Sequence, residues 1–514
     1  MCGIVAIVDS NSTSLQNEDQ VRVMLSKIRH RGDETNFAEL SSVGHSTLGC
    51  NRLAIVDRAH GRQPLIGNNG SIYAVQNGEI YNYLELRDQL TAKGYQFITE
   101  CDTEVLVHGY QEWGEKLVEH LDGMFAFVVY DSVSNTFFAA RDHIGIKPLY
   151  YLQKGDAYYF ASEIKCLIQL GNDIQVLQPG HFIVNGKTKQ YFKLSKESIE
   201  YNDETSIIAH FKELFVNSVK KMVQTDLPIG MIFSGGIDSA AVLSIARQYH
   251  NNITAFTIGF PGSPDVEIAK RYCEENKIDH KVQYLNIDDL ICNVTNIVSI
   301  CETFETIDVM DASLMYFAYK MAKNAGIKII LIGDGSDEVL AGYDFFKTSP
   351  DPEYLMTYRL GNLYRTDLQR SDRCSMIHSV EARPPFMDKE FLRFAYNVPF
   401  ELKLRNGIEK WILREAMADY LPDYIRLRKK VRLPEGSGLL SQLLDFVRSQ
   451  TSAVEQKILS RLKIDSTDGA YLLEEYLKAG FPIPHERYKK PNLDFSSNGY
   501  FEWSSDSKQL TKIS

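Results

Sequence analysis

Short apolar runs punctuated by Gly, Asn and Asp dominate the first part of the chain. Such runs are typical of strands in stacked antiparallel sheets, and they occur at residues 4–8, 72–75, 124–130 and 158–161. Apolar positions recur at helical spacing over residues 83–92 and 103–117. The pattern continues to about Phe192 and predicts an α+β domain.

The pattern changes after a polar stretch at residues 193–205. Strand-like and helical segments then alternate, which is typical of a parallel α/β sheet. We predict strands at 228–233, 254–260 and 327–331, and helices at 206–223, 238–249 and 312–325. Beyond about residue 351 the spacing is mostly helical, and a polar tail begins near residue 492. The chain is therefore predicted to form two domains, 1–200 and 201–514.

Composition narrows the class of protein. The 514 residues carry a net charge of -11, which argues against a nucleic-acid partner. The eight cysteines form no C-x-x-C pair and are too few for a disulfide framework, so a reducing cytosol is expected. No apolar run approaches the roughly 18 residues of a membrane helix, and the start lacks the features of a signal peptide. We expect a cytoplasmic protein without a membrane partner.

Cys2 follows the initiator methionine at the head of the first apolar run. Removal of Met1 would place a thiol and a free α-amine on one residue. Because an α-amine has a pKa of about 7.7–8.0, part of it is neutral near pH 7 and can take the thiol proton. This arrangement predicts an N-terminal nucleophile for acyl transfer. The alternative is an ordinary buried cysteine in a strand.

The motif Ser234-Gly235-Gly236-Ile237-Asp238-Ser239 lies between a predicted strand and a predicted helix. Its glycines let backbone amides converge on a phosphate at the helix N-terminus, where the two serine hydroxyls can also donate. Asp238 is better suited to hold a Mg²⁺ that binds the phosphate. No Gly-Lys-Ser/Thr follows, so this is not a Walker A loop. The alternative is a Gly-rich turn with a helix cap.

Two further segments carry charge. Gly333-Asp334-Gly335-Ser336-Asp337-Glu338 follows a predicted strand, where its carboxylates suit metal binding or acid–base chemistry; solvated acids in an Asx turn are the alternative. The basic run at residues 426–432 could close a lysine over a polyphosphate. It could equally be a solvated face.

Together these motifs resemble the glutamine-hydrolysing asparagine synthetase family. The resemblance extends from Met1 to about Tyr488 and includes, in order, residues 1–4, 51–57, 63–65, 77–82, 101–104, 122–126, 141–150, 161–165, 234–239, 259–265, 333–343, 372–388 and 410–414. It implies an α+β N-terminal-nucleophile domain, the class II glutamine amidotransferase, with stacked antiparallel sheets. An α/β adenine-nucleotide α-hydrolase-like (ATP pyrophosphatase) domain with a parallel sheet would follow.

The resemblance also implies two reactions. Cys2 would release ammonia from glutamine, leaving glutamate. In the second domain ATP, with Mg²⁺, would adenylate a carboxylate, most simply that of aspartate, and release pyrophosphate. Ammonia would cross an internal tunnel and displace AMP to give an amide. Homodimers are common in the family.

Site residues follow by position. In the first domain, Arg52 should pair with the glutamine α-carboxylate, Glu79 and Asp102 with its α-ammonium, and Asn77 and Gly78 should form an oxyanion hole. The remaining glutamine contacts should be Leu53, Ile55 and Val56. In isolation, Arg52 could be a surface residue and Asn77-Gly78 a hairpin turn.

In the second domain, Phe233 and Ile258 should flank the adenine, and Gly333, beside Ile332, should approach the ribose or base. Asp238 and Asp337 should hold Mg²⁺-pyrophosphate, and Asp334 takes the place of the acidic residue beside the acyl-adenylate. Lys430, or Lys429 one position away, should stabilise the departing pyrophosphate. The full ATP-binding set is Phe233, Ser234, Gly235, Gly236, Asp238, Ser239, Ile258, Ile332 and Gly333.

Three segments depart from the family pattern. The stretch His30-Arg31-Gly32-Asp33 lacks the usual proline, Ile332 and Asp334 replace a serine and a glutamate, and residues 305–313 lack an arginine before Ala-Ser. The last two departures cluster near the acceptor pocket, so a ligase acting on another carboxylate is an open alternative. A non-catalytic binding protein with this fold is a second. Phosphoribosyl amidotransferases share only the first half and are excluded by the Ser-Gly-Gly motif.

Overall fold

The computed structural model describes residues 2–9, 14–32, 39–43, 46–67, 70–200, 203–429 and 439–483. The chain divides into two compact units. The first comprises Met1–Leu194 together with Ser375–Glu381, and the second comprises Ser195–Cys374 and Ala382–Ser514. The first division falls inside the predicted linker, whereas the return of residues 375–381 to the first unit has no counterpart in the sequence pattern.

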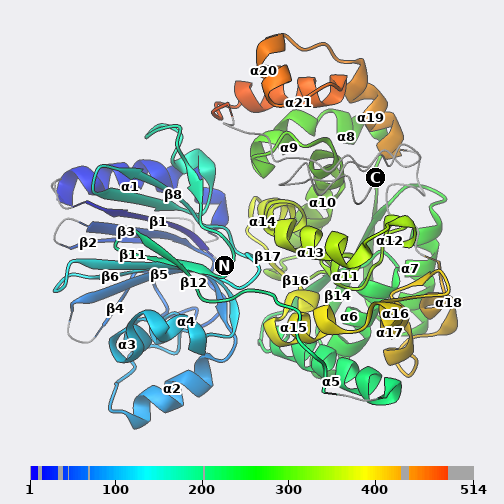
Figure 1. Cartoon of the computed structure of the whole chain (residues 1–514), viewed down its shortest axis with the longest axis horizontal. Helices are drawn as coiled ribbons and strands as arrows, with labels where there is room; N and C mark the ends of the chain where they lie inside the picture. Colours follow the sequence, from blue (N-terminus) through cyan, green and yellow to red (C-terminus); the bar gives the residue numbers. More distant parts are fainter. Residues whose placement is uncertain are drawn as a thin grey trace. The chain divides into compact units, whose positions relative to one another are not determined.

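Two six-stranded antiparallel sheets form the first unit (Figure 1). One has the order β10-β8-β9-β1-β3-β2, with bounds β1 Cys2–Val8, β2 Glu39–Val43, β3 Ser46–Arg52, β8 Tyr150–Lys154, β9 Ala157–Ala161 and β10 Gln175–Val176. The other has the order β12-β11-β7-β6-β5-β4, with bounds β4 Leu65–Ile66, β5 Ile72–Ile80, β6 Gly123–Asp131, β7 Thr136–Arg141, β11 His181–Val184 and β12 Lys187–Gln190.

The alternation of side chains explains this layering. Along β1, Ile4 and Ala6 face a core shared with Val75 and Val128 of the other sheet. The intervening residues of β1 face α1 (Ser14–Lys27) instead. The far side of the second sheet packs against α3 (Glu104–Trp113). Each sheet therefore has packing partners on both faces. This explains why every residue of β1 is buried.

One helix prediction in this unit is wrong in its extent. The helix predicted over 103–117 ends at Trp113, where Gly114 adopts a φ of 57°. A 3-10 turn (Gly114–Lys116) and a short helix α4 (Leu117–His120) follow. A glycine with positive φ ends a helix readily because it carries no Cβ. The neighbouring helix α2 spans Tyr83–Ala92, as predicted.

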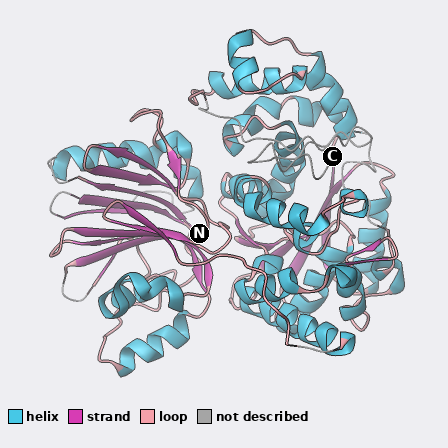
Figure 2. Ribbon diagram, viewed as in Figure 1, coloured by secondary structure: helices cyan, strands magenta, loops and turns pink. Residues whose placement is uncertain are grey.

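A five-stranded sheet lies at the centre of the second unit (Figure 2). Its order is β15-β14-β13-β16-β17, with bounds β13 Ile229–Ile232, β14 Ile253–Gly259, β15 Asp279–Tyr284, β16 Ile329–Leu331 and β17 Glu381–Arg383. Strands β13 to β16 pair in parallel. The predicted fold classes of both domains are confirmed. The chain runs outward from β13 to β15 and returns to β16 on the other side of β13, so the strand order reverses between β13 and β16.

Helices make up most of the rest of this unit. Their bounds are α5 Glu204–Met222, α6 Ile237–Tyr249, α7 Pro264–Glu275, α8 Ile287–Ile291, α9 Val294–Cys301, α10 Thr306–Asn324, α11 Ser336–Val339, α12 Phe345–Thr348, α13 Pro352–Asn362, α14 Asp367–Met376, α15 Lys389–Asn397, α16 Phe400–Lys403, α17 Trp411–Ala416, α18 Asp423–Arg426, α19 Leu439–Ser449, α20 Gln456–Arg461 and α21 Thr467–Lys478. A small hairpin, β18 Leu404–Arg405 and β19 Ile408–Glu409, interrupts them. No described helix is long and apolar enough to span a bilayer.

Candidate active sites

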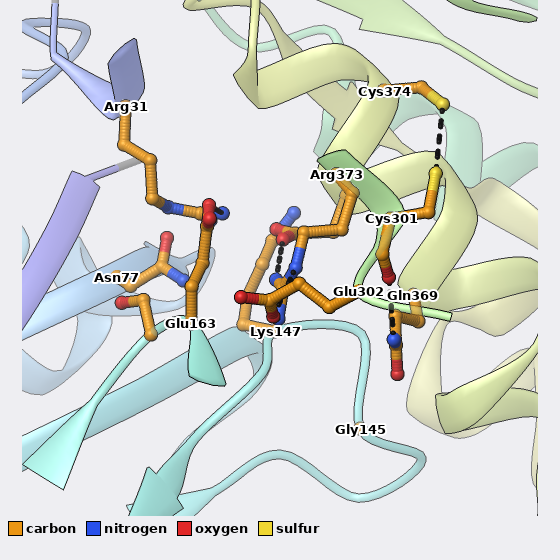
Figure 3. Close-up of polar contacts among 12 residues, drawn as sticks. Arg31, Asn77, Gly145, Lys147, Glu163, Cys301, Glu302, Gln369, Arg373 and Cys374 are labelled. Atoms are coloured by element: carbon orange, nitrogen blue, oxygen red, sulfur yellow. Dashed lines mark hydrogen bonds and ion pairs between the residues drawn. The ribbon is translucent and has the colours of Figure 1, made fainter. Parts of the chain in front are cut away.

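Cys2 begins β1 and lies directly opposite Arg52 of β3. Its thiol is almost fully buried. Arg31 donates from Nε to the carbonyl oxygen of Cys2 over 3.2 Å and pairs with Glu163 at 2.8 Å. Figure 3 shows Arg31, Glu163 and Asn77 in this part of the first unit. The predicted nucleophile is thus held by backbone and side-chain contacts on several elements.

The environment of Cys2 favours the thiolate. A hydrogen bond with the Cys50 thiol is the largest cause, and burial opposes it. The positive charge of the chain's N-terminus, the backbone of Leu53 and the charge of Arg52 act in the same direction as Cys50, and together they lower the pKa of Cys2 to about 7. A thiolate is the reactive form of cysteine. A lowered thiol pKa is expected for a nucleophile and not for an ordinary buried cysteine, so it supports the prediction made for Cys2.

Asn77 and Gly78 lie in the middle of β5, paired with Ala126 and Phe125 of β6. The alternative of a hairpin turn is therefore wrong. The side-chain Oδ1 of Asn77 accepts from the backbone N–H of Cys2 over 3.2 Å, while its buried Nδ2 has no hydrogen-bond partner among the described residues. Gly78 has a φ of 146°, and a Cβ there would collide with the carbonyl of Met124. A buried unused donor beside a nucleophile suits an oxyanion.

The alternative of a surface residue is wrong for Arg52, which is buried. Its guanidinium donates to the carbonyl oxygens of Arg58, Val56 and Asp57 at 3.2, 3.1 and 2.7 Å. These bonds hold the loop that follows β3, in which Leu53 and Ile55 are buried. A cation fixed in this way can bind a carboxylate without first being ordered.

Asp102 is buried and anchored at the edge of the same region. Its Oδ2 accepts from Gln76 Nε2 and from the backbone N–H of Ile80, both at 3.0 Å. Burial raises the pKa of this carboxyl, and these two bonds oppose the shift. Glu79, on β5, is also buried. Two carboxyls are therefore held in the unit that contains Cys2.

The second site lies at the carboxyl ends of β13 and β16, where the strand order reverses. Ligands of open α/β sheets bind at such a point. The loop between β13 and α6 is cross-linked by its own hydroxyls: Ser234 Oγ and Ser239 Oγ are 3.3 Å apart, and Gly236 N donates to Ser234 Oγ over 3.3 Å. Gly235 adopts a φ of 69°, in the left-handed region that favours glycine. A cavity of about 250 Å³ opens beside this loop.

A buried lysine, Lys410, lines this cavity. Lys410 Nζ pairs with Asp238 Oδ2 at 2.5 Å and with Asp337 Oδ1 at 2.7 Å, and Ser336 Oγ donates to Asp238 Oδ1 at 2.6 Å. Burial acts to lower the pKa of Lys410, but the two carboxylates outweigh it and raise that pKa. Gly342 makes this possible, because a Cβ there would collide with Asp337 and Lys410.

Asp334 lines another wall of the cavity. Burial raises its pKa to about 6, although the charge of Arg370 and a hydrogen bond from Ser371 oppose the shift. Arg370 itself pairs with Asp367 at 2.6 Å and with Asp311 at 3.5 Å. The alternative of freely solvated acids is wrong for Asp334. A carboxyl that titrates near pH 6 can exchange a proton with a ligand near neutral pH.

Comparisons with known proteins agree with this geometry. A family model for the glutamine amidotransferase domain matches residues 1–201, and one for asparagine synthase matches residues 210–352 and 348–490. The nodule glutamine-hydrolysing asparagine synthetase of Pisum sativum is 32% identical over 466 residues, which cover 85% of this chain and 78% of its own. The chain belongs to the glutamine-hydrolysing asparagine synthetase family.

Other relatives show how far the likeness extends. The glutamine-hydrolysing asparagine synthetase of Asparagus officinalis is 30% identical over 542 residues, which cover 98% of this chain and 90% of its own. Asparagine synthetase 2 of Lotus japonicus is 33% identical, covering 85% and 78%. Membership of the family makes this chain a carbon–nitrogen ligase of the asparagine synthase type.

Within this asparagine synthetase fold, many of the predicted ATP-site residues meet at one cavity. The predicted site residues among its lining are Ser234, Gly236, Asp238, Ser239, Ile332, Gly333, Asp334 and Asp337. Phe233, Ile258 and Gly235 are not among its lining. The buried ring of Phe233 lies against Tyr272, with 5.4 Å between ring centroids. Gly235 lies in the loop between β13 and α6, and its carbonyl oxygen accepts from Arg428 NH1 over 3.5 Å.

The basic run is only partly described. Lys429 is exposed and lines the cavity, while Lys430 lies outside the described residues. Arg428 pairs with Asp265 at 2.5 Å, which ties this run to the start of α7. The preference between Lys429 and Lys430 therefore stays a prediction.

Sequence reasoning missed three residues that this family member places at its sites. Lys410 begins a matching segment but has no chemical signal of its own. Gln63, in the matching segment 63–65, donates from Nε2 to Cys2 Sγ over 3.8 Å. Cys50 is identified only through its hydrogen bond with Cys2. Each of these residues contacts a partner that is far away in the sequence. Local patterns therefore gave no reason to assign it to a site.

Proposed function

We propose that this chain is a glutamine-dependent asparagine synthetase. It would transfer the amide nitrogen of glutamine to the side-chain carboxylate of aspartate, while ATP is converted to AMP and pyrophosphate. One observation carries the proposal: a single chain combines a buried thiol whose pKa lies near 7 with a lysine- and acid-lined cavity beside a phosphate loop. A glutaminase alone would not need the cavity, and a ligase using free ammonia would not need the thiol.

In the first unit, the Cys2 sulfur would attack the side-chain carbonyl of glutamine. The thiol proton would pass to the free α-amine of the same residue, and Asn77 Nδ2 and the Gly78 N–H would stabilise the oxyanion. The α-ammonium then returns this proton to the amide nitrogen, and collapse of the tetrahedral species breaks the C–N bond and expels ammonia. Water then cleaves the thioester to give glutamate and restores the thiol. Arg52 would hold the α-carboxylate and Asp102, with Glu79, the α-ammonium.

In the second unit, the loop from Ser234 to Ser239 would bind the ATP phosphates. Asp238 and Asp337 fit a Mg²⁺ ion, because two convergent carboxylates plus phosphate oxygens are a common ligand set for that metal. Bound there, Mg²⁺ would neutralise phosphate charge. Lys410 already balances the two carboxylates, so the site tolerates the incoming polyanion. Lys429 or Lys430 would screen the pyrophosphate as it leaves.

Asp334 would act after the acyl-adenylate has formed. Ammonia attacks the activated carboxyl carbon, the C–O bond to AMP breaks, and the nitrogen must lose a proton. The ionised form of Asp334 is suited to accept that proton. The cavity would thereby complete the amide.

The test follows pyrophosphate release with ATP, Mg²⁺ and glutamine, with and without aspartate, while mass spectrometry follows asparagine. Aspartate-dependent pyrophosphate matched by asparagine is the expected result. A Cys2→Ala variant should then make asparagine only from added ammonium. Glutamine hydrolysis without aspartate-dependent pyrophosphate would exclude aspartate as the acceptor. Inactivity of both halves would favour a non-catalytic binding protein.

A second candidate acceptor class has one observation in its favour. Arg370 lines the cavity near Asp334, yet Asp367 and Asp311 already compensate its charge. A compensated guanidinium attracts a second carboxylate less strongly. A carboxylic acid without the α-carboxylate of aspartate is therefore the alternative acceptor. The same pyrophosphate assay with a panel of monocarboxylic acids tests it, and release only with aspartate would reject it.

A further inference from the structure

Two cysteine thiols share one buried face of the first sheet. In the antiparallel register, Cys2 pairs with Arg52 and Ile4 pairs with Cys50. Residues opposite each other, and alternate residues along each strand, point to the same face. Cys2 and Cys50 are therefore diagonal neighbours on that face, and both belong to the buried cluster between the two sheets. Cys50 is 1% exposed, so no water competes for its thiol.

A second donor reaches the Cys2 sulfur from the loop between β3 and β4. Gln63 accepts from the backbone N–H of Gln76 through Oε1 at 2.6 Å, which fixes the orientation of its amide. Its Nε2 therefore points the other way and donates to Cys2 Sγ over 3.8 Å and to Thr103 Oγ1 over 3.2 Å. The sulfur of Cys2 thus has a directed amide donor in addition to the neighbouring thiol.

We propose that Cys50 is a positioning residue of the glutaminase reaction: its S–H donates to the Cys2 sulfur and, with Gln63 Nε2, holds that sulfur as a thiolate. This inference rests on the proposed glutaminase function. The proton that leaves Cys2 goes to the α-amine, and Cys50 keeps its own throughout. Burial raises the pKa of Cys50, so it stays protonated and remains a donor while Cys2 ionises.

The matched variants separate donation from packing. Cys50→Ala removes the donor, Cys50→Val removes it while filling the volume, and Cys50→Ser keeps a donor of similar size. Cys166→Ala is the control, because Cys166 is an equally buried cysteine of the same unit whose thiol contacts the carbonyl of Met24 instead. If Cys50→Ala unfolds the first sheet, Cys50→Val still tests the loss of the donor, because its side chain fills the same space.

The experiment uses the full chain and measures two pH profiles between pH 5.5 and 9.5. One is kcat/KM for glutamine hydrolysis, and the other is the rate of iodoacetamide alkylation of Cys2, followed by mass spectrometry of the N-terminal peptide. Removing a hydrogen bond to a charged group should raise both midpoints by about one pH unit and lower kcat/KM at pH 7 about tenfold. Cys50→Ser should stay within about threefold of the wild type, and Cys166→Ala should keep its midpoint.

The outcomes distinguish this inference from the function on which it rests. A wild-type enzyme that does not hydrolyse glutamine overturns both. An active enzyme whose Cys50→Ala and Cys50→Val variants keep the wild-type midpoints overturns this inference alone, and so does equal impairment of the serine and alanine variants. Cooperative thermal unfolding of each variant, with the same circular dichroism spectrum as wild type, shows that the first unit is folded.

Discussion

The side-chain amide of Asn77 uses its two ends differently. Its oxygen accepts from the backbone of Cys2, and its buried nitrogen has no partner among the described residues. A buried donor without a partner costs about 1–3 kcal/mol, so a ligand atom is expected to use it. The structure therefore adds a physical reason to the role that resemblance implies for this residue.

We expect Asn77→Asp to lower kcat for glutamine hydrolysis about 100- to 1000-fold, because it replaces the oxyanion donor by an acceptor. KM should change little, since the donor acts mainly on the transition state. Steady-state glutaminase kinetics measure this. Synthesis from ammonium should be unaffected, and a variant with normal kcat would assign the oxyanion to other donors.

Asp334 should impose a pH dependence on the synthetase half. Its pKa is raised to about 6 by burial, so the carboxyl is ionised at pH 7 and protonated below 6. Amide formation should therefore fall as the pH is lowered through about 6, because a protonated carboxyl cannot accept the proton of ammonia. Asparagine formation is measured with free ammonia held constant by adjusting the total ammonium.

The matched variants of Asp334 identify the titrating group. Asp334→Glu should keep the fall near pH 6 with reduced activity, because the carboxyl is retained on a longer chain. Asp334→Asn should be slow at every pH. If the asparagine variant retains the wild-type profile, another group accepts the proton.

At the scale of elements, short loops at strand ends determine the synthetase site. Strands β13 and β16 lie side by side, and the short loops that follow them lead into α6 and α11, whose first turns bring Asp238 and Asp337 together on Lys410. The strand–helix alternation could be predicted from apolar spacing, because that spacing is a local property of the sequence. The end of α3 at Trp113 could not, because it depends on Gly114 adopting a positive φ.

Gly342 tests how closely these loops must approach. We expect Gly342→Ala to lower aspartate-dependent pyrophosphate release about 100-fold, because its Cβ would displace Asp337 and Lys410. Gly361→Ala is the control, since Gly361 lies in α13 with open space around it. That change should be neutral or slightly stabilising. Full pyrophosphate release by Gly342→Ala would show that the lysine contact is dispensable.

At the scale of the whole molecule, a distant segment completes the first unit. Ser379, from residues 375–381, donates to the carbonyl oxygens of His30 and Gly32 at 2.8 and 3.0 Å. These two bonds hold the backbone of residues 30–32, just before the position at which the family pattern has a proline. Because residues 375–381 follow Cys374 of the second unit, the first unit contains a segment that comes much later in the sequence than the rest of it.

Asp308 should make the stability of the protein depend on pH. Burial raises its pKa from 3.8 to about 7, with Arg370 opposing the shift. Between pH 4 and 7 the folded chain keeps a proton that the unfolded chain has lost, so the free energy of unfolding falls as the pH rises. Above pH 7 this decrease in the free energy of unfolding is complete, and it amounts to at most about 4 kcal/mol.

We therefore expect Asp308→Asn to raise the melting temperature relative to wild type more at pH 8 than at pH 5. An asparagine has no charge to bury, so the variant lacks this part of the pH dependence. Thermal unfolding of both proteins at the two pH values measures it. An equal difference at pH 5 and pH 8 would show that Asp308 does not titrate in this range.

The two domain types could be predicted from the sequence, as could a candidate nucleophile at Cys2 and a candidate phosphate loop at residues 234–239, because these depend on local spacing and on motifs of a few residues. Only the tertiary structure decided which groups surround them. Lys410 meets Asp238 across 172 positions of the chain, and Gln63 meets Cys2 across 61. Hydrophobic periodicity fixes which face of an element is buried but not which distant element packs against it. The partners of the reactive groups therefore emerge only from the packed fold.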